Sequence, residues 1–277
     1  MNITIVYFSQ TGQTHKVAEA MATALRKKKH SVRLSAIQDV NQEDIKKCDL
    51  LAVGSPCFES QAPSPVKTWI RSWPVLQNKQ AFVFATAGGA PGLVLYDLTR
   101  ELRKKGAAVI GGFMSRGMVH HPAPCLIGRL PDRPNARDLS EARTFALAVD
   151  KHLKSGSDGN VPESRPDALK PTLGFYQLVG LIAKPFLLRI ILPKPKLTQN
   201  LCNQCQICAR ECPVQSITLA PYPVIDGRCI RCYHCQNVCP KKALNESWWY
   251  GNLVILSLYN TIFARLFGDL KRGESIY

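Results

Sequence analysis

Acidic residues are scarce in this chain. Its 277 residues include 20 Asp and Glu against 36 Lys and Arg, which leaves a formal net charge of +16. No acidic residue occurs between Ala168 and Arg210. This imbalance favours an acidic protein or an anionic membrane surface as partner. Because no nucleic-acid recognition motif accompanies the basic residues, we expect no nucleic-acid partner.

Long unbroken apolar runs are also missing. The most apolar stretches are Pro171–Pro193, which Lys184, Pro185 and Arg189 interrupt, and Leu253–Phe267. A bilayer span needs about twenty apolar residues, so we expect these stretches to pack inside the protein or to lie on an anionic membrane surface. The sequence shows no secretory signal, nucleophile triad or metalloprotease motif. It therefore predicts a cytoplasmic protein, peripheral at the inner face of the membrane in the second case.

Cysteine, in contrast, is abundant and regularly spaced. Eight of the eleven cysteines form two runs of the pattern C-x2-C-x2-C-x3-C-P, namely Cys202, Cys205, Cys208 and Cys212, then Cys229, Cys232, Cys235 and Cys239. Two-residue gaps let three thiolates of a tight loop converge on one cubane cluster, while a fourth arrives from elsewhere. Structural zinc is the competing interpretation, but it gives no reason for the third cysteine and the Cys-Pro pair of each run. A disulfide framework does not suit a chain of this length.

The first 155 residues alternate between predicted strands and helices. Apolar, β-branched and aromatic residues indicate buried strands at Asn2–Phe8, Ser31–Ile37, Leu50–Gly54, Gln80–Thr86 and Ala107–Met114. Between and after them, helices are predicted at Lys16–Lys29, Asn41–Lys47, Pro65–Arg71, Leu93–Lys105 and Leu139–Lys154. Such alternation predicts a doubly wound, five-stranded parallel sheet. Ligands of these sheets bind beyond the carboxyl ends of the strands, so we expect the loops after strands one, three and four to meet.

The loop after the first strand is small and rich in hydroxyl groups: Ser9-Gln10-Thr11-Gly12-Gln13-Thr14. It leads into a helix, whose unpaired N–H groups and dipole would attract an anion. Thr14 could also cap that helix, a role that Ser and Thr often play without any ligand.

Residues Tyr7–Thr14 resemble the FMN phosphate loop of flavodoxins, whose sheet has the strand order 2-1-3-4-5. The resemblance implies that the phosphate is held by Ser9, Gln10, Thr11, Gly12, Gln13 and Thr14. It also implies that the flavin ring is flanked by Ser55, Pro56, Cys57 and Phe58 on one side and by Thr86, Ala87, Gly88 and Gly89 on the other. Phe58 is the candidate for ring contact, or else an ordinary packing residue. The second loop departs from flavodoxins because it is glycine-rich where they often place a Tyr.

With its two cysteine runs, the chain resembles ferredoxins that carry a flavodoxin-like N-terminal region. In two-cluster ferredoxins the fourth cysteine of each run ligates the other cluster. The resemblance thus implies one [4Fe–4S] cluster on Cys202, Cys205, Cys208 and Cys239 and a second on Cys229, Cys232, Cys235 and Cys212. The expected fold is an α/β flavodoxin-like domain joined to a small α+β two-[4Fe–4S] ferredoxin domain. The expected bounds are 1–155, a linker with an apolar basic segment at 156–198, the ferredoxin domain at 199–245 and an extension at 246–277.

The function that the resemblance implies is electron transfer between two [4Fe–4S] clusters and FMN. Cubane clusters indicate a reducing, anaerobic cytoplasm, and the positive net charge indicates an acidic redox protein as partner. One alternative is a flavin-dependent reductase of a small molecule, fed by the clusters, in which Cys57, His120 or His121 would act on the substrate. The plain interpretation of these three residues is a packed thiol and two solvated histidines. Another alternative is a peripheral adaptor that docks on a redox complex.

Overall fold

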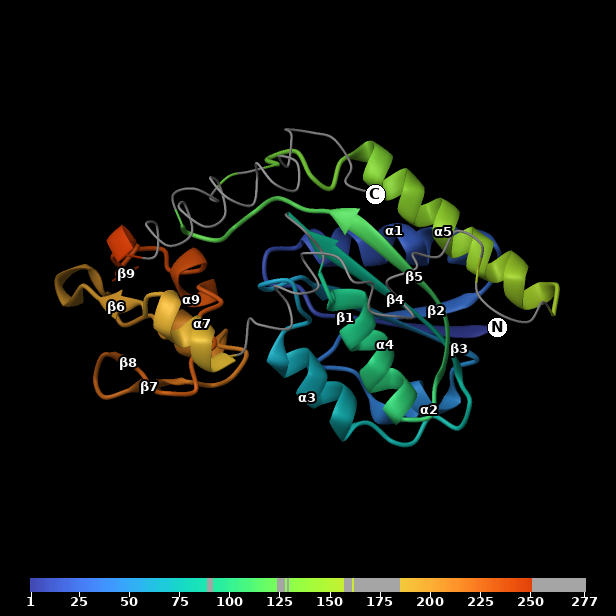
Figure 1. Cartoon of the computed structure of the whole chain (residues 1–277), viewed down its shortest axis with the longest axis horizontal. Coiled ribbons are helices and arrows are strands. Elements are labelled where there is room, and N and C mark those ends of the chain that lie inside the picture. The colour runs from blue at the N-terminus through green and yellow to red at the C-terminus, as the bar shows by residue number, and fades with distance from the viewer. Residues whose placement is uncertain (89–91, 124–127, 129, 157–160, 162–184, 251–277) are drawn as a thin grey trace. The chain divides into compact units, whose positions relative to one another are not determined.

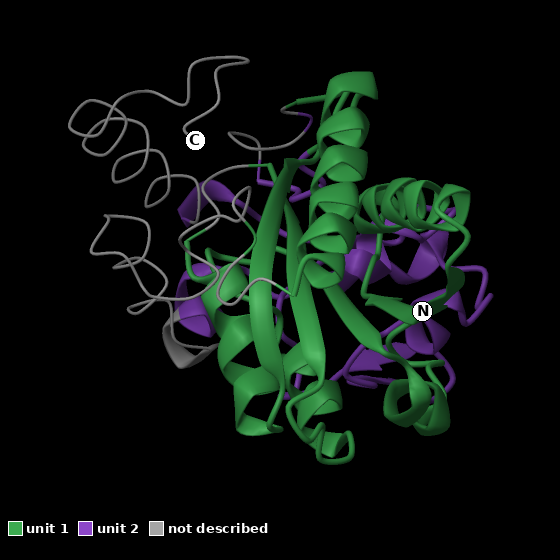
Figure 2. Ribbon diagram, turned by 90° about the vertical axis from the view of Figure 1, so that its right-hand side faces the viewer, with its two compact units in different colours: residues 1–118, 130–182 green, residues 119–129, 183–277 purple. Residues whose placement is uncertain are grey.

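The computed structural model describes residues 1–88, 92–123, 128, 130–156, 161 and 185–250. The chain divides into two compact units (Figure 2): residues 1–118 with 130–182, and residues 119–129 with 183–277. Segment 119–129 thus groups with the cysteine runs, whereas the sequence pattern predicts it within the first domain.

The first unit is built on a five-stranded parallel sheet with the order β2-β1-β3-β4-β5 (Figure 1). Its strands are β1 (Asn2–Tyr7), β2 (Ser31–Ala36), β3 (Leu50–Pro56), β4 (Gln80–Ala87) and β5 (Ala108–Arg116). Successive side chains point to opposite faces, so a sheet covered on both faces needs strands that are apolar throughout. The predicted α/β flavodoxin-like fold with strand order 2-1-3-4-5 is confirmed.

Helices cover both faces of this sheet (Figure 1). They are α1 (Gln13–Lys27), α2 (Gln42–Lys47), α3 (Ser64–Ser72), α4 (Val94–Lys104) and α5 (Ala136–Lys154). Apolar residues of α1 and α5 pack on one face, with Ile5 and Phe82 among their strand partners. Those of α2, α3 and α4 pack on the other face, against Val53 and Val83. Both faces are therefore buried, and the loops at the strand ends are left to form a site.

Several parts of the chain lie wholly or mostly outside the described residues. The apolar stretch Leu253–Phe267, most of Pro171–Pro193, Gly89 and Cys125 are among them. Within the predicted linker, Val161 is described: it is buried and its N–H donates to the Ile110 carbonyl at 2.9 Å. No helix in the described ranges is long and apolar enough to cross a membrane. The membrane-surface hypothesis for the two apolar stretches therefore stays a prediction.

The second unit is a twofold repeat with a period of 27 residues. A short helix α7 (Pro185–Ile191) and a 3-10 turn η2 (Gln199–Leu201) come first. Helix α8 (Ile207–Arg210) then recurs as α9 (His234–Asn237). Two antiparallel strand pairs complete the unit, β6 (Lys196–Leu197) with β9 (Leu244–Asn245), and β7 (Ile217–Leu219) with β8 (Pro223–Ile225). Each cysteine run therefore lies on the same local scaffold.

Candidate functional site

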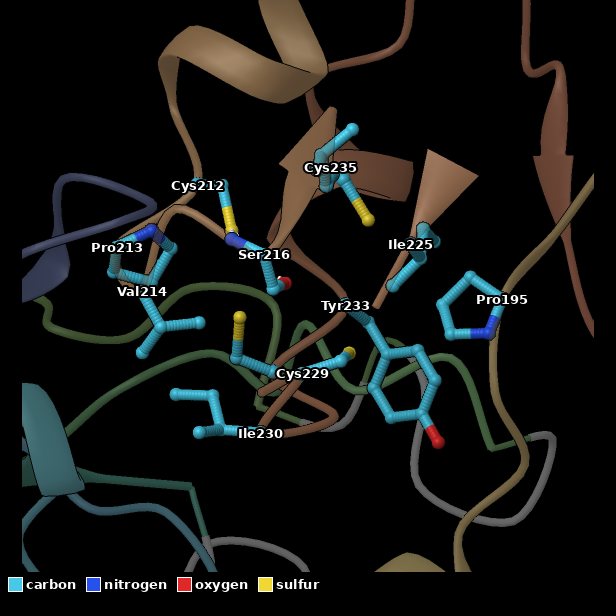
Figure 3. A pocket seen from close by; sticks show the side chains of 12 residues that line it. Pro195, Cys212, Pro213, Val214, Ser216, Ile225, Cys229, Ile230, Tyr233 and Cys235 are labelled. Atoms are coloured by element: carbon cyan, nitrogen blue, oxygen red, sulfur yellow. Dashed lines mark hydrogen bonds between the residues drawn. The ribbon is translucent and has the colours of Figure 1, made fainter. Parts of the chain in front are cut away.

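Two cavities in the second unit are each lined by four cysteines. One cavity is lined by Cys202, Cys205 and Cys208 of the first run with Cys239 of the second. The other is lined by Cys229, Cys232 and Cys235 with Cys212, and Figure 3 shows the side chains of Cys212, Cys229 and Cys235 around one common space. The cysteines are grouped as the resemblance implied, while ligation itself stays a prediction.

The backbone explains how three cysteines so close in sequence reach one cavity. Gln204 and Gln206 take left-handed conformations with φ of 58° and 62°, and Arg231 and Tyr233 do the same in the second run with φ of 58° and 56°. Non-glycine residues rarely adopt this region, because it costs of order 1 kcal/mol each. The repeated left-handed turns wrap each loop around its cavity, and a short helix then brings in the third cysteine.

Backbone N–H groups point at the cysteine sulfurs. The Gln204 N–H donates to Cys202 Sγ at 3.4 Å, the Ser216 N–H to Cys212 Sγ at 3.4 Å, and the Ala243 N–H to Cys239 Sγ at 3.3 Å. Hydrogen bonds of this kind stabilise negative charge on a ligating sulfur and help to set the potential of an iron–sulfur cluster.

The cysteines of each cavity also repel one another once ionised. Burial raises the pKa of the Cys208 thiol, and the charges of Cys205, Cys239 and Cys202 raise it further. Burial likewise raises the pKa of Cys235, followed by the charges of Cys232, Cys229, Cys208 and Cys212. Four thiolates around one cavity would therefore repel one another unless a positively charged group lay between them. Within the part of the chain that the structure describes, no group of three or more His, Cys, Asp or Glu side chains is placed to hold a single metal ion.

The two candidate histidines, His120 and His121, lie in segment 119–129 and therefore belong to the second unit. His121 lies edge-on against Tyr233 and Trp248, with ring centroids 5.1 and 5.2 Å apart. Burial lowers the pKa of His121 to about 4, so its imidazole is neutral at neutral pH. The His120 carbonyl accepts a hydrogen bond from the Asn237 side chain at 3.4 Å, and burial lowers the pKa of His120 as well. This setting favours packing over proton donation, and the catalytic hypothesis remains untested.

In the first unit, the loop after β1 leaves the start of α1 open. The N-cap of α1 is Gly12, with φ of 81° and no side-chain cap, so the prediction that Thr14 caps this helix is wrong. Space remains in front of the helix, because a Cβ added to Gly12 would meet no atom within 4 Å. Uncapped N–H groups and open space at a helix N-terminus suit a phosphate. Ser9, Gln10 and Gln13 around them are half-buried, and Thr11 is exposed.

Hydrogen bonds join the first turn of α1, the loop after β3 and the end of β4, at the edge where the switch-point rule predicted that the loops would meet. Thr14 Oγ1 lies 2.8 Å from Thr86 Oγ1 in a buried pair. The Cys57 N–H donates to the Thr86 carbonyl at 2.8 Å, and the Gly117 N–H donates to the Ala87 carbonyl at 3.1 Å. The strand-end loops therefore form one connected edge, which also includes Ser55, Pro56 and Gly88.

The loop after β3 closes into a tight turn in which Phe58 and Gln61 exchange N–H···O bonds of 2.9 Å. The half-buried Phe58 ring packs against Phe8, with centroids 6.5 Å apart. This contact favours the packing interpretation of Phe58. The half-buried Cys57 is a poor nucleophile, because burial and then the Glu59 carboxylate raise the pKa of its thiol.

Two residues near these sites have roles that the sequence did not reveal. The Asp97 carboxylate, 3 % exposed, accepts the Ala62 N–H at 3.2 Å and pairs with Lys67 and Arg100, which fixes the turn after β3 to α4. An acidic residue in the first turn of a predicted helix was the available signal. Ser216, beside Cys212, stands where the other half of the repeat has Ala243, and aligning the two cysteine runs would have revealed it.

Known proteins resemble parts of this chain. The profile of the flavodoxin domain family matches residues 4–108. The chain is 33% identical over 90 residues to an uncharacterized protein of Methanocaldococcus jannaschii, covering 27% of this chain and 35% of that protein. It is 25% identical over 148 residues to a flavodoxin of Megasphaera elsdenii, covering 52% of this chain and 99% of the flavodoxin. A solved flavodoxin from the domain Archaea covers 56% of this chain and 99% of its own at 22% identity and a TM-score of 0.45.

Together, the family match and the strand order identify the N-terminal part of the chain as a flavodoxin-like domain. The chain spans about a third of the length of the Methanocaldococcus jannaschii protein and nearly all of the Megasphaera elsdenii flavodoxin.

Proposed function

We propose that this protein is an electron carrier in which the flavodoxin-like domain holds FMN and the cysteine-rich unit holds two [4Fe–4S] clusters, with electrons passing between them. The observation that carries the proposal is the pair of cavities, each lined by three cysteines of one run and the fourth of the other. When bound, FMN would exchange one or two electrons and each cluster would exchange one. The protein could therefore convert between two-electron and one-electron transfer.

The residues of the first unit suit the FMN phosphate. No side chain caps the N-terminus of α1, and a Cβ added to its N-cap residue Gly12 would meet no atom within 4 Å. The adjoining edge, built by the Thr14–Thr86 and Cys57–Thr86 hydrogen bonds, offers main-chain groups to the flavin ring. These main-chain groups would bind and orient the cofactor, while the Phe58 ring, packed on Phe8, supports the turn after β3.

Replacing Thr11 by Asp should weaken FMN binding at least tenfold. Thr11 is exposed at the open end of α1, so the new carboxylate would repel the phosphate without disturbing the core; a repulsion of about 1.4 kcal/mol corresponds to tenfold in affinity. The control is Thr144→Asp, the same change at an exposed position of α5. Titration of the flavin-free chain with FMN gives both Kd values. Equal Kd values for the two variants would rule out the proposal that this loop holds the FMN phosphate.

Exchange between flavin and clusters can be followed directly. After flash reduction of the anaerobic holoprotein by less than one electron per molecule, the added electrons should redistribute between the flavin and the clusters. The absorbance bands of the two centres report this redistribution. The rate should not depend on protein concentration, because both centres belong to one chain. A rate that rises in proportion to concentration would mean that electrons move only between molecules, and the proposal would fail.

The small-molecule reductase remains the second candidate, but no described residue favours it. His121 is neutral at neutral pH, and the pKa of the Cys57 thiol is raised. The partner proposed for the carrier is an acidic redox protein in the cytoplasm, because the chain carries a formal charge of +16. FMN and cluster charges would reduce this excess without reversing its sign.

A further inference from the structure

Two of the positions that line the cavities differ in exposure and polarity, although the scaffolds repeat. In the first run, Asn203 follows Cys202 and Gln206 follows Cys205, and both side chains are exposed. The equivalent positions of the second run hold Ile230, which is half-buried, and Tyr233, which is 1 % exposed. The Tyr233 ring packs against Trp248, and its hydroxyl donates to the Pro193 carbonyl at 2.8 Å. At these two positions, a cluster in the second cavity would therefore meet less polar side chains.

This difference affects reduction. Adding an electron raises the negative charge of a cluster from about −2 to about −3, because its four thiolates outweigh the iron–sulfur core. Water and hydrogen-bond donors stabilise the added charge, and apolar walls do not. With nothing to compensate, the second cluster would be harder to reduce than the first, and electrons would collect on the first.

One side chain offers such compensation. Ser216 lines the second cavity, is 1 % exposed, and has its Oγ 3.4 Å from Cys212 Sγ. A ligating thiolate carries no proton, so the hydroxyl must be the donor. The Ser216 N–H donates to the same sulfur at 3.4 Å, and the Ser216 carbonyl accepts the Asp226 N–H at 2.8 Å, which holds the residue in place.

The other half of the repeat provides an internal comparison. Ala243 occupies the equivalent place in the first cavity, and its N–H donates to Cys239 Sγ at 3.3 Å. The backbone hydrogen bond is thus common to both halves, and the hydroxyl is present only at the second cavity. Packing does not account for this difference, because both residues are small and both are 1 % exposed.

We propose that Ser216 is a tuning residue whose hydroxyl, by donating to Cys212, raises the reduction potential of the second cluster and keeps it within reach of the first. This inference rests on the proposed function, since it requires clusters in both cavities. It assigns the compensation for the apolar walls of the second cavity to one side chain. The effect requires no change in fold, because the hydroxyl adds to a backbone hydrogen bond that is already made.

The test is an EPR-monitored redox titration of the full-length holoprotein and of two variants. Ser216→Ala should lower the midpoint potential of one cluster and leave the other unchanged. A roughly tenfold change in the reduction equilibrium is expected, which for one electron is about 59 mV. Ala243→Ser is the matched variant and should raise the midpoint of the other cluster. A merely structural role for Ser216 would move neither midpoint.

Iron and sulfide are measured on each sample before titration. Wild-type protein without clusters would overturn the proposed function itself. With clusters at full occupancy, a Ser216→Ala variant whose two midpoints are both unchanged, or shifted alike, would overturn only the tuning role. If Ser216→Ala loses iron, titration of Ala243→Ser decides alone, and an unchanged midpoint there would likewise overturn the inference.

Discussion

Gly54→Ala is expected to destabilise the five-stranded unit by about 3 kcal/mol or more, a large effect for the addition of one methyl group. A Cβ on Gly54 would lie 2.1 Å from Cζ and 2.2 Å from Cε2 of Phe84. Gly54 and Phe84 are register partners in β3 and β4, and the Phe84 ring is fully buried against the helices of one face. Because neither strand nor ring can yield, the clash must be relieved by displacing the centre of the sheet.

Hydrogen–deuterium exchange of the full chain measures this effect within the first unit, because peptides from β3 and β4 should lose protection. Gly117→Ala is the matched control, since its new Cβ would lie 3.5 Å from Thr86 Cβ, an ordinary contact. Replacing the Phe84 ring by the shorter leucine side chain, with Phe84→Leu in the Gly54→Ala background, should restore part of the lost protection. Equal protection in Gly54→Ala and wild type would contradict the close packing of β3 on β4.

Cys205→Ala and Cys239→Ala are expected to abolish the same cluster, although they lie in different cysteine runs. Both side chains line the first cavity, whereas Cys212 and Cys232 line the second. Each single substitution removes one of four thiolates, so each variant should keep about half of the iron. The first two variants should share one EPR spectrum after reduction, and Cys212→Ala and Cys232→Ala should share the other.

Alanine is used because a serine oxygen could replace the lost ligand. Far-UV circular dichroism of each variant serves as the folding control, since the strands of the five-stranded unit contain none of the substituted residues. If the variants pair by run, with Cys205→Ala resembling Cys212→Ala, the exchange of the fourth cysteine between the runs is wrong.

The sheet could be predicted from the sequence because each strand is buried on both faces and is therefore apolar throughout. Leu50 to Val53 shows this, with neighbouring side chains entering opposite cores. Helix starts were harder to place. Helix α5 begins at Ala136, before the predicted Leu139, because Asn135 and Asp138 form a capping box, and α1 begins at Gln13 behind Gly12. These boundaries depend on a few local hydrogen bonds that hydrophobic periodicity does not reveal.

The site was predictable where its residues are neighbours in sequence. Spacing predicted that Cys202, Cys205 and Cys208 would converge, and they line one cavity. The position of Cys239 in that cavity came from a resemblance, because no local rule connects residues in different loops. The packing of His121 on Tyr233 and Trp248 could not be foreseen for the same reason, since it joins segments far apart in the chain.

The most direct test of the proposed electron carrier is the cofactor content of anaerobically purified protein, with iron, acid-labile sulfide and released flavin measured on one sample. We expect about eight irons, about eight sulfides and one FMN per chain. Full clusters without flavin, even after incubation with FMN, would leave the flavodoxin-like domain without its proposed cofactor. One or two zinc ions in place of iron and sulfide, after expression and handling under anaerobic conditions, would contradict the central claim that the two cysteine-lined cavities carry electrons.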